Sequence, residues 1–171
     1  FDISQTDPID PDADDPTVLA RDLEGDDPGI LAAVTDYLTA NGWAVTREQL
    51  HGSRKGYTSI DGSRRVVIDA DLSPAHAAKT ALHEAAHTIL HADEEPAEYI
   101  EHRGVKETEA ESVAYVVDAL AGLDTSAYSI GYVAGWSHCQ TQTIKDTAAR
   151  VLRAAHGLAD AITETDTHAA A

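Results

Sequence analysis

The chain has 171 residues, of which 43% are hydrophobic, and it contains no apolar run of the length that crosses a bilayer. Its formal net charge is −18, from 12 Lys and Arg against 30 Asp and Glu, and a surface this acidic repels phosphate backbones. The single cysteine excludes an internal disulfide framework, and the first residues lack the basic and apolar stretches of a signal peptide. We therefore expect one cytoplasmic domain that binds neither a membrane nor nucleic acid directly.

Residues 1–28 differ in composition from the rest of the chain. They contain ten Asp or Glu against the single Arg21, together with four prolines. We interpret this stretch as a solvated acidic linker or arm, with an acidic docking tail as the alternative. The chain also has no methionine, so we expect a fragment or a processed product, with part of the protein preceding Phe1.

The first elements after Pro28 are a helix and a hairpin. Apolar residues at helical spacing predict a helix that ends near "NG" at 41–42. The stretch 43–50, "WAVTREQL", is compatible with more than one element. Two β-prone runs follow, joined by Asp61-Gly62, and they predict a hairpin because this pair tolerates positive φ.

Three helices are predicted in the remainder. Ser73-Pro74 suits a helix start, so we expect a helix over about 74–91. A second is predicted over roughly 105–121 and a long amphipathic one from 138 to about 164, with a packed loop between them and fraying at 166–171. These elements predict a mostly helical α+β domain over 29–165 with one short β-sheet.

The stretch "HEAAH" in the 74–91 helix carries a pattern typical of zinc chemistry. Zinc catalysis requires neutral imidazoles that converge on one point, with a coordination position left open for water. His83 and His87 are four residues apart and share one helix face, so both can bind one ion. Glu84 is placed to accept a proton from that water, which is the division of labour in an H-E-x-x-H motif.

We expect the third ligand in the following helix, "VKETEAESVAYVVDAL". At 100° per residue Glu109 falls on the apolar face with Val113 and Leu120, whereas Glu111 falls on the opposite side with Asp118, and Glu107 falls near the edge. A buried carboxylate is costly unless a cation compensates it. The sequence therefore predicts a metal site of His83, His87 and Glu109.

Other polar residues near this motif have less defined roles. His91 is one turn beyond His87, too far along a straight helix to share the ion, and we interpret it as a residue that supports a ligand or lies on the surface. A peptidase also needs a donor that stabilises the oxyanion, or the transition state more generally. The candidates are Tyr115, Tyr128, Tyr132 and His138, for each of which a packing or surface role is the alternative.

"HEAAHTILH" followed by "ETEAESVAYVV" resembles the zincin-like metallopeptidase domain of the ImmA/IrrE superfamily. The chain is closer still to the C-terminal domain of actinobacterial ArdC-type antirestriction proteins, through residues 109–117, 122–129 and 132–136. The resemblance covers roughly 65–145 and implies zinc ligands His83, His87 and Glu109, with Glu84 as the base. Val113 departs from the family pattern, which often has an aromatic residue there.

Two interpretations of function follow. The first is a zinc metallopeptidase that hydrolyses peptide bonds in a peptide or protein substrate, within an antirestriction protein of mobile elements. The alternative is a catalytically weak zincin-fold binding or regulatory module. In ArdC-type proteins such a domain follows a single-stranded-DNA-binding domain, and "FDISQT" resembles the junction, so we expect any DNA binding to belong to a domain that precedes Phe1.

Overall fold

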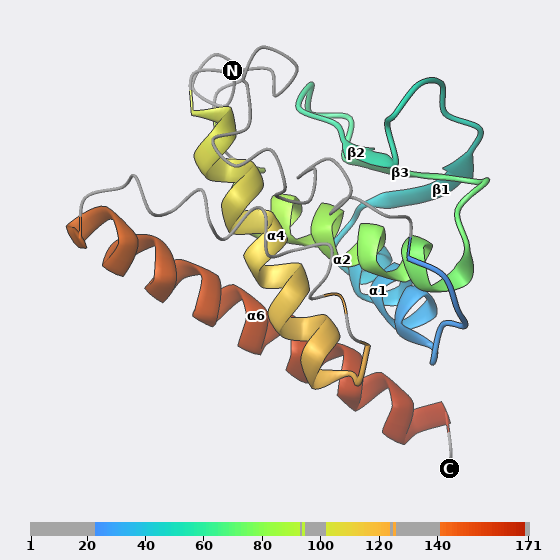
Figure 1. Ribbon diagram of the computed structural model, residues 1–171. Helices are drawn as coiled ribbons and strands as arrows, with labels where there is room; N and C mark the ends of the chain where they lie inside the picture. Colours follow the sequence, from blue (N-terminus) through green and yellow to red (C-terminus); the bar gives the residue numbers. More distant parts are fainter. Residues whose placement is uncertain (1–22, 93, 95–101, 124, 126–140, 170–171) are drawn as a thin grey trace, which may run out of the picture.

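The computed structural model describes residues 23–92, 94, 102–123, 125 and 141–169. In chain order this part contains α1 (Ile30–Ala40), β1 (Ala44–Glu48), β2 (Gly56–Thr58), β3 (Arg65–Asp69), α2 (Pro74–Leu90), α4 (Arg103–Leu120) and α6 (Thr141–Ala169). Helices predominate and the three strands form one small sheet (Figure 1), which confirms the predicted α+β class.

The sheet has the strand order β1-β3-β2. β2 and β3 are antiparallel, with Tyr57 opposite Val67, as the Asp61-Gly62 turn predicts. β1, the stretch that the sequence left ambiguous, pairs parallel with β3. β3 is thus the central strand, and its residues 66–69 are buried, whereas β2 is an edge strand among the strands that the structure describes.

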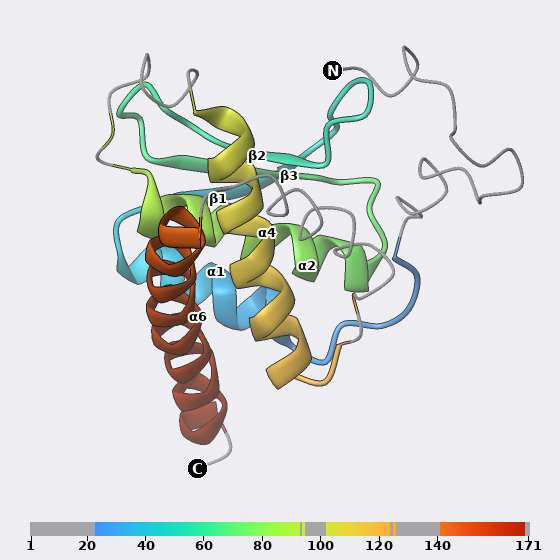
Figure 2. The ribbon, with the colours of Figure 1, turned by 60° about the vertical axis from the view of Figure 1, so that its left-hand side comes forward.

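α2 is the central helix of the fold. The Ser73 hydroxyl accepts a hydrogen bond from the His76 amide at 3.2 Å and Pro74 occupies the first turn, so the local sequence defines the start. α2 contacts α1, α4 and α6, and also β2 and β3 (Figures 1 and 2). Because neighbours surround it, most of its side chains are buried, including the polar ones.

The predicted faces of α4 need correction. Glu111 and Asp118 were expected on the exposed side, but they are 1% and 0% exposed, whereas Leu120 of the expected apolar face is 65% exposed. α4 packs against both α2 and α6, so the helix is buried on more than one side. A single apolar stripe therefore does not describe its environment.

Residues near both expected ends of the domain have defined contacts or secondary structure. Leu23, within the predicted arm, donates its amide to His76 Nδ1 at 3.0 Å, and the Gly25 carbonyl accepts from the Ala75 amide at 3.3 Å. α6 extends to Ala169, past the predicted end near 164.

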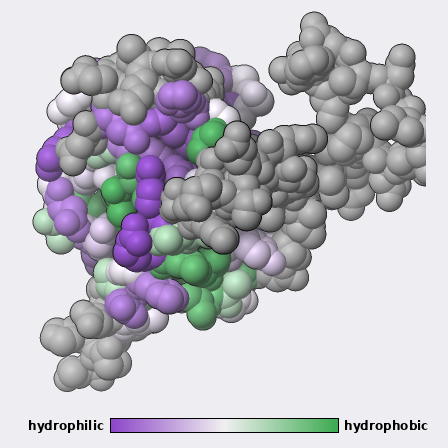
Figure 3. Space-filling model, turned by 90° about the vertical axis from the view of Figure 1, so that its left-hand side faces the viewer, coloured by the Kyte–Doolittle hydropathy of each residue, from purple (hydrophilic) through white to green (hydrophobic). Residues whose placement is uncertain are grey.

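The described surface is mixed in polarity. Figure 3 shows hydrophilic side chains beside hydrophobic ones on one face. The exposed large hydrophobic residues are Ile60, Ile89, Val105, Leu120 and Leu152. Within the described ranges, no helix combines the length and the apolar character that crossing a membrane requires.

Candidate metal centre

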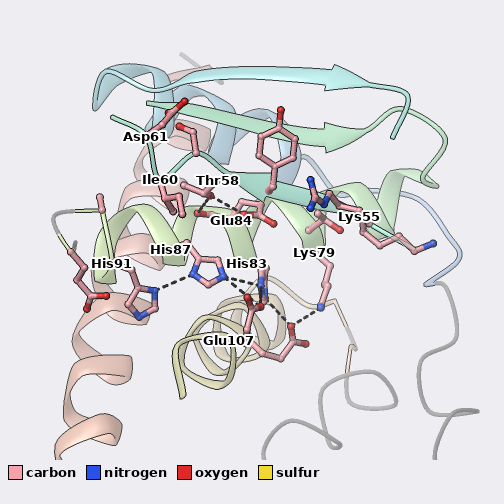
Figure 4. A pocket seen from close by; sticks show the side chains of 18 of the residues that line it. Lys55, Thr58, Ile60, Asp61, Lys79, His83, Glu84, His87, His91 and Glu107 are labelled. Atoms are coloured by element: carbon pink, nitrogen blue, oxygen red, sulfur yellow. Dashed lines mark hydrogen bonds and ion pairs between the residues drawn. The ribbon is translucent and has the colours of Figure 1, made fainter. Parts of the chain in front are cut away.

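Two histidines of α2 and one glutamate of α4 converge on one point (Figure 4). The Nε2 atoms of His83 and His87 are 3.1 Å apart. Glu107 Oε2 lies 3.3 Å from His83 Nε2 and 3.7 Å from His87 Nε2. The i and i+4 spacing on α2 produces the first contact, and the packing of α4 against α2 produces the other two.

These separations suit a zinc ion. A tetrahedral zinc with bonds of about 2.0–2.1 Å holds its ligand atoms about 3.3 Å from one another. The three measured separations, 3.1, 3.3 and 3.7 Å, lie around that value. Two imidazole nitrogens and one carboxylate oxygen are also a donor set that catalytic zinc sites use, and the set leaves a position open. His83, His87 and Glu107 therefore fit the metal, and of the described residues they form the group that can hold one.

Glu111 holds the other side of the His83 ring. Its Oε2 lies 3.0 Å from His83 Nδ1 and 2.7 Å from the ammonium of Lys79. The side chains of Glu111 and Lys79 are almost fully buried. A carboxylate on the distal nitrogen fixes the orientation and tautomer of a ligand histidine, because Nδ1 then carries the proton and Nε2 keeps its lone pair for the metal.

His91 and Glu109 support the His87 ring in a similar way. His87 Nδ1 lies 3.0 Å from His91 Nδ1, and His91 Nε2 lies 2.9 Å from Glu109 Oε2. If His87 Nε2 is kept free for a metal, His87 Nδ1 donates to His91 Nδ1, and His91 Nε2 donates to Glu109. Every hydrogen bond then has one donor and one acceptor with both rings neutral.

The structure places Glu109 away from the position that the sequence predicted for it. Glu109 is 3% exposed, but its carboxylate binds His91 and accepts from Arg150 Nη2 of α6 at 3.1 Å. Glu107, two residues earlier and near the predicted edge of the helix, is the carboxylate that lies within reach of both histidine Nε2 atoms. The burial of Glu109 is compensated by His91 and Arg150, so its burial does not require a metal.

The electrostatics of the group favour a bound cation. Burial opposes protonation of the His83 ring, but the hydrogen bonds that the ring donates to the Glu107 and Glu111 carboxylates outweigh it and raise the pKa of His83 to about 9. Burial lowers the pKa of His87. Although burial alone would raise them, the pKa of Glu107 falls well below its ordinary range and that of Glu111 falls to about 2, because the histidines bind both carboxylates. The carboxylates stay ionised, and without a metal the His83 ring holds a proton near neutral pH, which a bound zinc ion would replace.

Glu84 faces β2 rather than the ligand group. Its Oε2 accepts from the Thr58 hydroxyl at 2.8 Å, and Glu84 is 6% exposed. Gly56 allows this approach: a Cβ there would lie 3.1 Å from Glu84 Oε1 and 2.7 Å from Thr80 Cγ2. The base that the sequence predicts is therefore held between α2 and the edge strand, next to the ligand histidines.

A cleft of about 900 Å³ opens along this arrangement. One side is a continuous run of residues 53–61, which includes β2, and the other side contains His83, Glu84, His87 and Glu107. Figure 4 shows Lys55 and Lys79 near one end of the cleft, and Ile60, Asp61 and His91 near the other.

Of the predicted oxyanion donors, the structure describes Tyr115 alone. Tyr115 is half-buried and is absent from the cleft lining. Tyr128, Tyr132 and His138 lie outside the described residues. No sequence pattern assigned a role at this site to Glu107, Thr58, Gly56 or Lys79. The spacing of Glu107 and Glu111 carried a usable signal, because it repeats the i and i+4 spacing of the two histidines and places both carboxylates on one face.

The α+β fold and this His-His-Glu group are consistent with a zincin-like domain. Residues 39–121 match the model of the Peptidase_M78 family, described as an IrrE N-terminal-like domain. The matched segment contains the sheet, α2 and α4, and so the whole ligand group. The expected resemblance to the ImmA/IrrE superfamily is confirmed for this segment, whereas the closer resemblance to ArdC-type proteins stays a prediction. Comparisons with curated proteins and with solved structures found no match.

Proposed function

We propose that this chain is a zinc-dependent peptidase in which His83, His87 and Glu107 hold the metal and Glu84 is the general base. The observation that carries the proposal is the convergence of the three ligand atoms beside Glu84, at the edge of β2. When bound, zinc supplies Lewis acidity, which polarises a carbonyl and makes a neighbouring water more acidic.

The edge strand is suited to bind a peptide in extended form. Ser59 donates its amide to Arg65, and Asp69 donates to Lys55, so Lys55, Tyr57 and Ser59 direct their backbone groups toward β3. Since these groups alternate along an antiparallel pair, the N–H and C=O groups of Gly56 and Thr58 point to the outer edge. A peptide can add to this edge by backbone hydrogen bonds without a sequence-specific contact.

Glu84 then moves the proton. Thr58 holds Oε2, which leaves Oε1 to accept a proton from the attacking water and to deliver it to the nitrogen of the leaving amine. Glu111 and the His91–Glu109 pair keep the two imidazole rings in position during these steps. The reaction class is hydrolysis of a peptide bond, and the substrate is a peptide or an extended protein segment.

A Glu84→Gln variant tests the proposal. The amide keeps the size and hydrogen bonding of the side chain but accepts no proton, so kcat on a peptide library should fall about 10²- to 10⁴-fold while bound zinc is retained. Glu24→Gln, at an exposed position far from the cleft in sequence, is the matched control and should match the wild type. Zinc-loaded wild-type protein that cleaves no peptide would favour the binding or regulatory module instead.

We also propose the wider context: a cytoplasmic antirestriction protein of the ArdC type, on the sequence resemblance alone. We propose in addition that this segment itself does not bind nucleic acid, since its net charge is −18. Titration with a labelled single-stranded oligonucleotide at low salt tests the second point, and salt-sensitive micromolar binding would contradict it.

A further inference from the structure

The edge strand brings charges of opposite sign to the two ends of the cleft. Arg54 and Lys55 directly precede Gly56, and Asp61 follows the strand. The pKa of Asp61 is lowered by its hydrogen bonds to Ser63, so its carboxylate stays ionised. On the helix side of the cleft, Lys79 pairs with Glu111, and Glu94 pairs with Lys106. The β2 side thus places basic residues at one end of the cleft and an acidic residue at the other.

The basic end of the cleft, at Arg54 and Lys55, is unusual for a chain with so few basic residues. Lys and Arg number 12 against 30 acidic residues, yet two adjacent cations line this cleft. The Arg54 guanidinium carbon lies 5.5 Å from the centre of the Tyr57 ring, which holds it beside β2. Among the described residues Arg54 has no carboxylate partner, so its guanidinium can bind one from a ligand.

The charges also select a direction for a peptide on the β2 edge. In an antiparallel arrangement the C-terminal part of the peptide lies beside Arg54 and Lys55, and the N-terminal part lies beside Asp61. A parallel arrangement reverses both pairings. Glu84 contacts Thr58 and lies close to Gly56, which places the reacting bond near Tyr57. Arg54 is three residues earlier, about 10 Å along a strand.

We propose that Arg54 and Lys55 form a specificity site for a carboxylate located two or three residues C-terminal to the scissile bond of an antiparallel peptide. The carboxylate is that of an Asp or Glu side chain or that of the C-terminus itself. The inference rests on the proposed peptidase function, because it defines the substrate class of the same cleft.

The test uses three peptides with the same central apolar residues. The first is a decapeptide blocked at both ends with Asp at the second and third positions after the central bond, and the second is its isomer with both Asp on the N-terminal side. The third is uncharged apart from a free C-terminal carboxylate, and its chain ends three residues after the central bond. Because the first two have equal net charge, general repulsion by the acidic protein affects them equally. We measure kcat/KM with the zinc-loaded chain, and Kd with its zinc-loaded Glu84→Gln variant.

We expect the first peptide to exceed the second about fivefold in kcat/KM and in affinity, as a partly exposed ion pair with Arg54 beside the charge of Lys55 would give. The third shows whether a C-terminal carboxylate substitutes for the side chains. The Arg54→Gln/Lys55→Gln variant should show equal kcat/KM and equal Kd for the two isomers. The control Arg153→Gln, on the exposed side of α6, should keep the wild-type preference for the first peptide. High salt should reduce the preference of the wild type.

The outcomes separate the two proposals. Equal kcat/KM and equal Kd for the isomers, with hydrolysis observed, overturn the specificity site and leave the peptidase standing. If the first peptide binds with the lower Kd but no peptide is hydrolysed, the proposed peptidase function is wrong and the carboxylate site at Arg54 and Lys55 is supported. Neither hydrolysis nor a Kd difference overturns both. A preference that survives in Arg54→Gln/Lys55→Gln also overturns the assignment to these two residues.

Discussion

At the scale of single residues, Glu111 combines two roles that a variant can separate. It orients His83, and it is the counter-charge of the buried Lys79. Glu111→Gln should destabilise the fold by about 3–5 kcal/mol, because it leaves a buried ammonium without its partner. Denaturant unfolding measures this loss.

The double variant Lys79→Met/Glu111→Gln distinguishes the roles. Removing both charges together should recover much of the unfolding free energy, while zinc affinity should stay about 10- to 100-fold below the wild type because His83 still lacks its carboxylate. Full recovery of zinc affinity in the double variant would show that Glu111 acts on folding alone.

Asp118 gives the fold a pH dependence of defined sign. It is fully buried, its oxygens have no hydrogen-bond partner in the part of the chain that is described, and burial raises its pKa to about 7. A raised pKa means that the folded state binds the proton more tightly. The stability from this proton is complete below pH 4 and is lost as the pH rises through 7, by about 4 kcal/mol at most.

Asp118→Asn removes this loss. For metal-free protein, the unfolding free energy of the variant relative to the wild type should rise by a few kcal/mol between pH 4 and pH 8. Urea unfolding at both pH values measures the difference. A difference that does not change with pH would mean that the Asp118 carboxyl titrates normally.

The choice between Glu107 and Glu109 shows what sequence could predict at this scale. The H-E-x-x-H pattern predicted His83 and His87 because their relation is local to one helix turn. The third ligand depends on how α4 rotates against α2, and a buried position has several possible partners. Glu109 is buried and its carboxylate binds His91 and Arg150, the second of which belongs to α6, so helix periodicity could not distinguish it from a metal ligand.

At the scale of elements, Gly56 sets the distance between β2 and α2. A Cβ there would lie 2.7 Å from Thr80 Cγ2 and 3.0 Å from the Val67 carbonyl oxygen. Gly56→Ala should displace the edge strand from Glu84, with a loss of about 1–3 kcal/mol in stability and at least about tenfold in kcat/KM. Unfolding and peptide turnover of the same preparation test this.

Gly157→Ala is the matched control for that substitution. A Cβ at Gly157 meets nothing within 4 Å, and the residue lies inside α6. Its replacement should stabilise the helix by about 0.5–1 kcal/mol and leave turnover unchanged. Equal behaviour of the two variants would mean that β2 tolerates a side chain against Glu84.

Local signals predicted the elements better than their pairing. Ser73-Pro74 and Asp61-Gly62 act within a few residues, and the helix start and the antiparallel hairpin followed from them. The parallel pairing of β1 with β3 joins Ala44 to Arg65 and depends on the packing of α1 and α2 beneath the sheet. No pattern within residues 43–50 contains that information.

At the scale of the whole molecule, the ligand group connects α2 to α4 across the core. A bound metal stabilises the folded chain by about 2.7 kcal/mol at a free concentration of 100 Kd. Chelation should therefore lower Tm by roughly 5–10 °C for a chain of this length. Calorimetry with zinc and with a chelator measures the shift, and Glu107→Ala should show none. An unchanged Tm after verified zinc loss would make the site peripheral to the fold.

The most direct measurement of the central claim is the zinc content of Glu107→Ala and Glu109→Ala after dialysis against a competing chelator. If His83, His87 and Glu107 hold the metal, the wild type retains stoichiometric zinc and Glu107→Ala retains almost none. Glu109→Ala removes the support of His87 through His91 and the ion pair with Arg150 but leaves the three ligand atoms in place. It should bind zinc about 10- to 100-fold more weakly and reach stoichiometry when zinc is in excess. Stoichiometric zinc in Glu107→Ala together with an empty Glu109→Ala would contradict the account.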